Sequence, residues 1–122
     1  MDLPRDEQEA FGLSSSAAGD LWVITVAGEL DFTTLDPLER ARAEALRTHS
    51  GPIAFDLSGV GFCDSSLLNL LLLTRRQRRV LLIGVTRQTQ RLLDVTGTAS
   101  VFEQYATVPD AVAGRAPLIA LD

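Results

Sequence analysis

Few side chains in this 122-residue sequence could perform acid–base, nucleophilic or metal chemistry. His49 is the only histidine, Cys63 is the only cysteine, and all eleven basic residues are arginine. The absence of lysine excludes a phosphate-loop motif and Schiff-base catalysis, since both need a lysine amine. One histidine and one cysteine are too few for a zinc site, which takes several such ligands at close spacing. The sequence therefore predicts no catalytic residue, no metal site and no cofactor.

Three further features resemble fragments of known active sites. Asp56 ends an apolar run, as the phosphate acceptor of a receiver domain does, but that chemistry also needs an acidic pair and a lysine. We therefore interpret Asp56 as a hydrogen-bond acceptor that caps its own loop. Gly59 and Gly61 form a G-x-G fragment without the third glycine of a dinucleotide-binding fingerprint. His49 lies near a predicted helix end, where an interaction with solvent or with the helix dipole is expected.

A triplet of Asp64, Ser65 and Ser66 is the remaining candidate, because it directly precedes a leucine-rich run. Aspartate and serine are preferred N-cap residues, so the triplet predicts the start of a helix. From the residue types alone, the favoured interpretation is that Asp64 and Ser65 cap this helix, and a functional role stays open.

The elements that must position this triplet are strands and helices in alternation. Apolar, β-branched runs predict strands over residues 10–13, 21–27, 53–57 and 80–85, and a short last strand over residues 101–105. Small and polar residues predict a turn over residues 14–20 and a loop over residues 58–63. This alternation predicts an α/β fold: a single domain with a mixed, mostly parallel sheet of four to five strands and helices packed on it.

Helical periodicity and capping residues mark the predicted helices. Asp36 is the expected N-cap of a helix that begins with Pro37 and runs to about residue 50. The leucine helix that follows the triplet is apolar on more than one face and ends in a basic cluster, which is expected to be solvated. This cluster comprises Arg75, Arg76, Arg78 and Arg79. Thr86 is expected to cap a helix that turns Leu92, Leu93 and Val95 inward and ends at Gly97, and residues 109–112 predict a brief final helix.

Composition and charge limit the possible partners and location. The chain is 46% hydrophobic and 22% charged, which is typical of an ordinary globular domain. A net charge of −5 argues against binding to nucleic acid or anionic lipid. No apolar run approaches the ~18 residues of a membrane span, and an unpaired cysteine fits a reducing cytoplasm. We expect a flexible leader over residues 1–9, one domain over residues 10–113 and a C-terminal tail over residues 114–122.

The segment of residues 56–73, DLSGVGFCDSSLLNLLLL, resembles the central signature of the STAS domain family, the anti-sigma factor antagonists. That signature is a strand, the pattern D-L-S-x-V-x-F-x-D-S-S-G-L and then a helix, and every defined position from Asp56 to Ser66 matches. Residues 28–31 resemble the family's G-E-L-D turn, and residues 92–102 resemble its L-x-x-T-G-x-x-x-x-F segment. The resemblance covers residues 10–113 in the family's order and spacing.

The resemblance implies a partner-switching regulator that is a kinase substrate and not an enzyme. In the family, an anti-sigma factor with a histidine-kinase-like ATPase fold phosphorylates the first serine of the D-S-S triplet, here Ser65. The unphosphorylated antagonist binds that kinase and frees a sigma factor, and a serine phosphatase resets the phosphorylated form. The implied partner-binding residues are Asp31 in the G-E-L-D turn, Asp64, Ser65, Ser66 and Leu67.

Leu67 stands where the family pattern has glycine. We expect that its side chain either packs inward and shifts the helix or lies exposed in a contact patch. The departure keeps an alternative function open, namely a divergent STAS module for small-ligand sensing or for assembly in a larger signalling complex. The leucine helix is either wholly buried or contributes to a weak homodimer contact.

Overall fold

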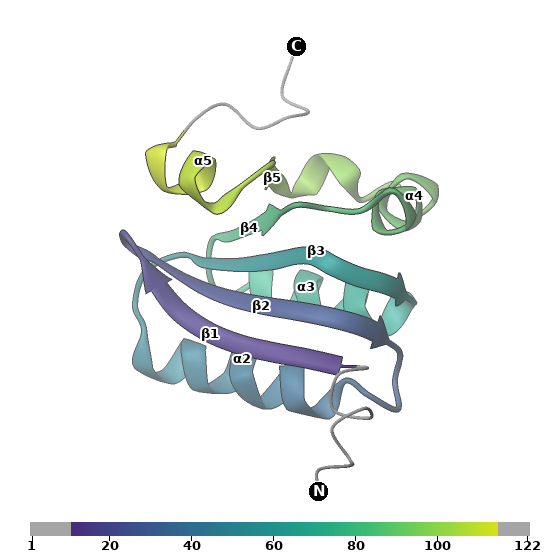
Figure 1. Ribbon diagram of the computed structural model, residues 1–122, viewed down its shortest axis with the longest axis horizontal. Coiled ribbons are helices and arrows are strands. Elements are labelled where there is room, and N and C mark those ends of the chain that lie inside the picture. Colours follow the sequence, from purple (N-terminus) through teal and green to yellow (C-terminus); the bar gives the residue numbers. More distant parts are fainter. Residues whose placement is uncertain (1–10, 115–122) are drawn as a thin grey trace, which may run out of the picture.

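A five-stranded mixed sheet forms the centre of the computed structural model, which describes residues 11–114 (Figure 1). The strand order is β1-β2-β3-β4-β5, with β1 antiparallel to β2 and the other neighbours parallel. The strands are β1 Phe11–Ala18, β2 Leu21–Leu30, β3 Ile53–Cys63, β4 Val80–Ile83 and β5 Glu103–Tyr105. The helices are α2 Asp36–Thr48, α3 Ser65–Arg75, α4 Arg87–Val95 and α5 Val108–Ala113, with a 3-10 turn at Ala99–Val101. The predicted α/β class, single domain and mixed sheet are therefore confirmed. Residues 1–10 and 115–122 lie outside the described residues, and they include the expected leader over residues 1–9 and all but the first residue of the expected tail over residues 114–122.

The first hairpin is longer than predicted. The predicted turn over residues 14–20 is wrong, because β1 continues through the serine run and only Gly19 and Asp20 turn the chain. Ser14 pairs with Thr25 and Ser16 pairs with Val23 in the antiparallel ladder. Serine tolerates this position because β1 is an edge strand, where backbone pairing to β2 holds the chain while the side chains face solvent.

The strand β3 also exceeds its predicted length. The predicted loop over residues 58–63 is wrong, since β3 runs unbroken to Cys63 and β2 runs past Gly28 to Leu30. Irregularities in the β2–β3 register accommodate the glycines, and a Cβ on Gly59 would lie only 2.8 Å from the Ala27 Cβ. Glycine is required there because the two strands approach each other closely. The strand β4, by contrast, ends two residues earlier than predicted.

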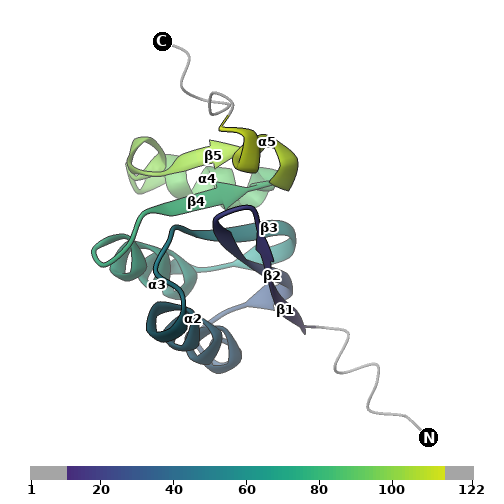
Figure 2. The ribbon, with the colours of Figure 1, turned by 90° about the vertical axis from the view of Figure 1, so that its left-hand side faces the viewer.

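The sheet buries both of its faces to different extents. Figure 2 shows α2 and α3 on one side of the sheet and α5 on the other. The larger core lies between the sheet and the helices α2, α3 and α4, and it includes Phe55, Leu57 and Leu82 of the sheet. The smaller core lies under α5 and includes Leu81 and Tyr105. The leucine helix α3 is therefore mostly buried, which explains its apolar character on more than one face.

Two details of the other helices differ from the predictions. Leu35 is the N-cap of α2 and makes no side-chain capping bond, so Asp36 is already the first helical residue, and the helix ends at Thr48. The Val95 side chain is 74% exposed and does not turn inward. It lies two positions after the buried Leu93, which places it on the opposite side of α4. Thr86 caps α4 as predicted, by accepting a hydrogen bond from the Thr89 backbone N–H.

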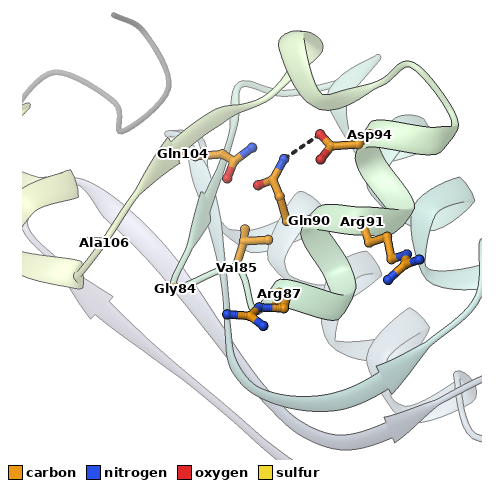
Figure 3. A pocket seen from close by; sticks show the side chains of 8 residues that line it. All are labelled: Gly84, Val85, Arg87, Gln90, Arg91, Asp94, Gln104 and Ala106. Carbon is orange, nitrogen blue, oxygen red and sulfur yellow. Dashed lines mark hydrogen bonds between the residues drawn. The ribbon is translucent and has the colours of Figure 1, made fainter.

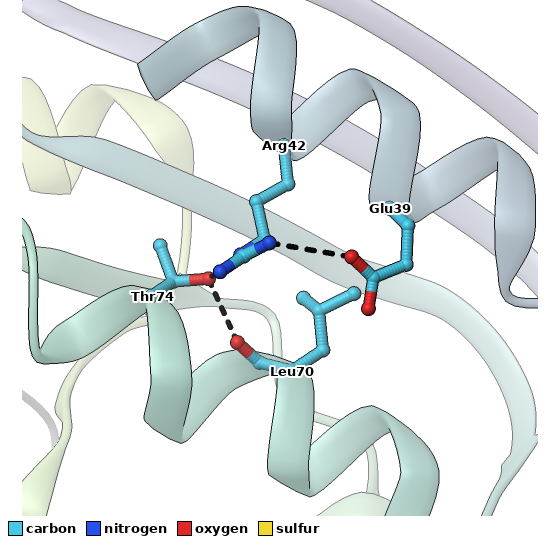
Figure 4. Close-up of polar contacts among 4 residues, drawn as sticks. All are labelled: Glu39, Arg42, Leu70 and Thr74. Atoms are coloured by element: carbon cyan, nitrogen blue, oxygen red, sulfur yellow. Dashed lines mark hydrogen bonds and ion pairs between the residues drawn. The ribbon is translucent and has the colours of Figure 1, made fainter. Parts of the chain in front are cut away.

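Polar contacts join α2 to the segment around α3 (Figure 4). The Arg42 Nε donates to the Thr74 Oγ1 at 2.6 Å, and that hydroxyl donates to the Leu70 carbonyl at 2.7 Å. The Arg42 guanidinium also pairs with Glu39 at 3.2 Å. Because Thr74 is fully buried, these bonds fix α3 against α2 along its C-terminal half.

The basic cluster after α3 is only partly solvated. Arg78 donates to the carbonyls of Leu46, His49 and Gly51, so it closes the C-terminal end of α2. Arg79 donates two bonds to the Glu103 carboxylate on β5, at 2.7 and 2.8 Å. The expectation of a solvated cluster is therefore wrong for Arg78, whose guanidinium takes the place of water at the open carbonyls of a helix end.

Candidate functional site

Ser65 is the first residue of α3, only Asp64 separates it from the carboxyl end of β3, and its side chain is exposed. Asp64 is the N-cap, and its Oδ1 accepts a hydrogen bond from the Ser66 backbone N–H at 2.8 Å. The Leu67 N–H donates to the Asp64 carbonyl at 3.1 Å. Within the described part of the chain, the Ser65 hydroxyl has no hydrogen-bond partner. Of Asp64 and Ser65, only Asp64 forms the capping hydrogen bond of α3 with its side chain. The Ser65 hydroxyl is therefore available to react.

A shallow groove runs from this serine along the exposed side of α3. It has a volume of about 480 Å³ and is lined by Ser65, Ser66, Leu68, Asn69 and Leu72. The groove begins at the positive end of the helix dipole, where a phosphate on Ser65 would be stabilised. A partner that binds in the groove would contact the polar residues Ser65 and Ser66 at one end and the apolar side chains of Leu68 and Leu72 beyond them.

The turn after β2 reaches the same edge of the sheet as Ser65, namely the edge formed by the carboxyl ends of β2 and β3. Leu30 pairs with Cys63 in the parallel ladder, so the turn that begins at Asp31 and the triplet that begins at Asp64 follow neighbouring strand ends. The Asp31 Oδ1 accepts from the Thr33 hydroxyl at 2.6 Å and from its backbone N–H at 2.8 Å. These bonds lower the pKa of the Asp31 carboxyl and hold it ionised at neutral pH. Asp31 is thus a fixed negative group on the edge that carries Ser65.

Two exposed aromatic side chains on this edge were missed by the sequence analysis. Phe32 follows Asp31 and is 76% exposed, and Phe62 near the end of β3 is 41% exposed. Exposed aromatic groups of this size are typical of protein–protein contact surfaces. Strand alternation would place Phe62 on the same face as the buried Val60, so the sequence held no signal for its exposure.

The remaining predicted contact residues differ in their accessibility. Ser66 is half-buried, and its backbone N–H is held by Asp64. Leu67 is 1% exposed and belongs to the core beneath α3. Of the two alternatives for Leu67, the structure shows inward packing. Its side chain is therefore covered, and only its backbone lies in the exposed first turn.

The remaining side chains that could perform chemistry, those of His49, Asp56 and Cys63, contact only their local surroundings in the fold. His49 follows the last residue of α2, with its Nε2 3.3 Å from the Asp20 carbonyl and its ring centroid 5.8 Å from that of Trp22. Asp56 accepts two bonds from Ser58, as expected for a local capping acceptor. Cys63 is buried, and this burial raises the pKa of its thiol.

Residues 11–114 contain neither a cluster of potential metal ligands nor a membrane-spanning helix. No group of three or more histidine, cysteine, aspartate or glutamate side chains in that range could hold a metal ion. No helix in that range is both long and apolar enough to cross a membrane.

Comparison with known proteins places these features in context. Residues 13–103 match the protein-family model described as "Mlab, STAS domain". The anti-sigma-F factor antagonist RsfB of Mycobacterium tuberculosis is 29% identical over 96 residues, covering 75% of this chain and 79% of that protein.

Two solved structures share the fold. An anti-sigma factor antagonist from Mycobacterium paratuberculosis superposes with a TM-score of 0.79 at 24% identity, covering 87% of this chain and 94% of that one. The Bacillus cell fate determinant SpoIIAA in its phosphorylated form gives a TM-score of 0.64 at 21% identity, covering 86% and 98%. At these identities, the likeness is one of fold.

Proposed function

The chain belongs to the STAS domain family, and from this premise we propose that it is a cytoplasmic anti-sigma factor antagonist switched by phosphorylation of Ser65. Its partner is an anti-sigma factor serine kinase with a histidine-kinase-like ATPase fold. The unphosphorylated form binds this kinase and releases a sigma factor, and a serine phosphatase restores that form after phosphorylation. The names of the similar mycobacterial proteins support the antagonist assignment, and the phosphorylated form of SpoIIAA supports a phosphorylated state.

The observation that carries the proposal is the state of the Ser65 hydroxyl. It is exposed and has no partner in residues 11–114, while the neighbouring Asp64 supplies the capping bond of α3. Phosphorylation therefore removes no hydrogen bond of the fold. The added charge lies at the helix N-terminus, where it is stabilised locally. The domain is expected to remain folded while its surface changes.

Phosphorylation of Ser65 is expected to lower the affinity for the kinase, because it places charge on a surface that the kinase covers. A phosphate adds about −2 of charge beside Asp64 and on the edge that carries Asp31. When a partner covers this edge, an unpaired or like charge costs several kcal/mol, which weakens a complex about a hundred-fold or more. The exposed rings of Phe32 and Phe62 supply apolar area that such a partner could bury.

In this proposal the protein is a substrate, and the catalytic groups, ATP and magnesium belong to the kinase. Ser65 accepts the γ-phosphoryl group of ATP through its hydroxyl oxygen, the hydroxyl proton goes to a base on the kinase, and ADP leaves. The groove beside Ser65 and the turn at Asp31 provide the docking edge.

The test is intact-mass analysis of the protein after incubation with ATP, magnesium and histidine-kinase-like anti-sigma factors from the same genome. One added phosphate is expected, localised to Ser65 by fragmentation. Ser65→Ala should abolish the addition, and the matched control Ser15→Ala should retain it because Ser15 is an exposed serine on the edge strand β1 that does not line the groove. Phosphate on another residue, or none with every candidate kinase, would contradict the proposal.

A further inference from the structure

A second hollow lies between α4 and β5, beyond the carboxyl end of β4 (Figure 3). Its volume is about 660 Å³, within the range of small-molecule sites. It shares no lining residue with the groove beside Ser65.

The hollow contains a buried donor that lacks an acceptor. Gln104 on β5 is 3% exposed, and its Nε2 has no hydrogen-bond partner in the described part of the chain. Figure 3 shows its carboxamide pointing from β5 toward α4, on the side of Gln90. Nearly all buried polar groups in folded proteins are hydrogen-bonded, so an unpaired one indicates a missing partner. A ligand oxygen entering the hollow would supply that acceptor.

The charged groups around the hollow favour an anion. Arg87 and Arg91 stand one turn apart on α4, both exposed, and neither has an ion pair within residues 11–114. The one carboxylate in the lining, Asp94, accepts a bond from the Gln90 Nε2 at 2.9 Å. Arg87 is the first residue of α4, so its guanidinium adds to the positive end of the helix dipole.

We propose that this hollow binds a small-molecule oxyanion, a phosphate ester or a carboxylate. One oxygen of the ligand accepts a hydrogen bond from the Gln104 Nε2, and the Arg87 guanidinium pairs with its charge. Asp94 accepts from a hydroxyl or amine elsewhere on the same ligand. A small molecule fits better than a protein partner, because the Gln104 donor is buried and is met only by a group that enters the hollow.

The test is an NMR titration of the ¹⁵N-labelled full chain at constant ionic strength. The probes are glycerol 3-phosphate, malate and a hexaglutamate peptide. The reporters are the side-chain NH₂ resonance pair of Gln104 and the backbone amide resonances of Gly84, Gln90 and Ala106, which line the hollow and also report on variants that lack Gln104. A saturable shift of this pair with glycerol 3-phosphate or malate is expected, and the tighter probe identifies the phosphate or carboxylate source. No saturable shift with either small probe up to about 20 mM would overturn the proposal, as would binding of the peptide alone.

Variants separate ligand binding from a structural role of the same side chains. Gln104→Leu removes the unpaired donor while keeping a similar volume, so it should weaken binding at least ten-fold and leave the urea midpoint unchanged or raised. Arg87→Gln should also weaken binding, whereas Arg40→Gln, an exposed arginine on α2, should not. Equal affinity in Gln104→Leu would overturn the proposal. Ser65→Ala should bind the probes normally, which makes this test independent of the proposed phosphorylation.

Discussion

The hydrogen bond between Arg42 and Thr74 is expected to stabilise the position of α3 because solvent is largely excluded from it. The Nε to Oγ1 distance is 2.6 Å, Thr74 is fully buried, and the Arg42 side chain is only 13% exposed. Thr74→Val keeps the side-chain shape but removes the acceptor, leaving a shielded guanidinium N–H without a partner. A hydrogen bond to a charged group contributes about 1.5–3 kcal/mol, so a loss of about 2 kcal/mol in the free energy of unfolding is expected.

The assay is urea unfolding of a double-mutant cycle built from Arg42→Met and Thr74→Val. A coupling energy of about 1–2 kcal/mol is expected, because the two side chains share one shielded bond. The control Arg40→Met changes an exposed arginine on the same helix and should alter stability by less than about 0.5 kcal/mol. Additive effects of the two substitutions, with a coupling near zero, would refute the reasoning.

Three further outcomes are expected from single substitutions. Asp64→Ala should lower the free energy of unfolding by about 1 kcal/mol by removing the 2.8 Å capping bond to Ser66, while Asp64→Asn, which retains an acceptor, should stay within a few tenths in urea titrations. Arg79→Gln should cost no more than about 0.5 kcal/mol at pH 7, because the pair with Glu103 is partly exposed and screened by solvent. The hydrogen bonds from Arg79 lower the pKa of the Glu103 carboxyl. The stabilisation by this pair is therefore present above the unfolded-state pKa of Glu103 and disappears as the pH falls through its folded-state pKa. A difference in unfolding free energy between Arg79→Gln and the unmodified protein that persists in acid would contradict this. Leu67→Gly should cost about 3–6 kcal/mol in the same titrations, because it empties a core position and places glycine in a helix, and a loss below about 1 kcal/mol would contradict the burial of Leu67.

Local patterns in the sequence were sufficient to predict the element order and the start of α3. Aspartate and serine before a leucine run specify a helix N-terminus through backbone hydrogen bonding, and Thr86 does the same for α4. The strand lengths were not predictable in this way. Residues 58–63 contain a serine and two glycines, which favour a loop, yet β3 continues through them because β2 supplies the pairing and register shifts absorb the irregularity.

The parts of the candidate site that sequence reasoning missed depend on tertiary placement. The exposure of Phe32 and Phe62 follows from where the ends of β2 and β3 lie in the sheet, and aromatic residues in such runs otherwise read as core. Likewise, Gln104 is a polar residue in a short edge strand, a position that ordinarily indicates exposure, yet it is only 3% exposed. Neither feature has a periodic signature along the chain.

The proposed switch is tested most directly by measuring the affinity of the kinase for the protein with and without phosphate on Ser65. Isothermal titration calorimetry with the anti-sigma factor identified by mass analysis would give both dissociation constants, and Ser65→Ala would serve as the unmodified control. The phosphorylated protein is expected to bind about a hundred-fold more weakly or worse, while Ser65→Ala binds as tightly as the unmodified protein. Equal dissociation constants for the phosphorylated and unmodified forms would contradict the assignment of Ser65 as the switch.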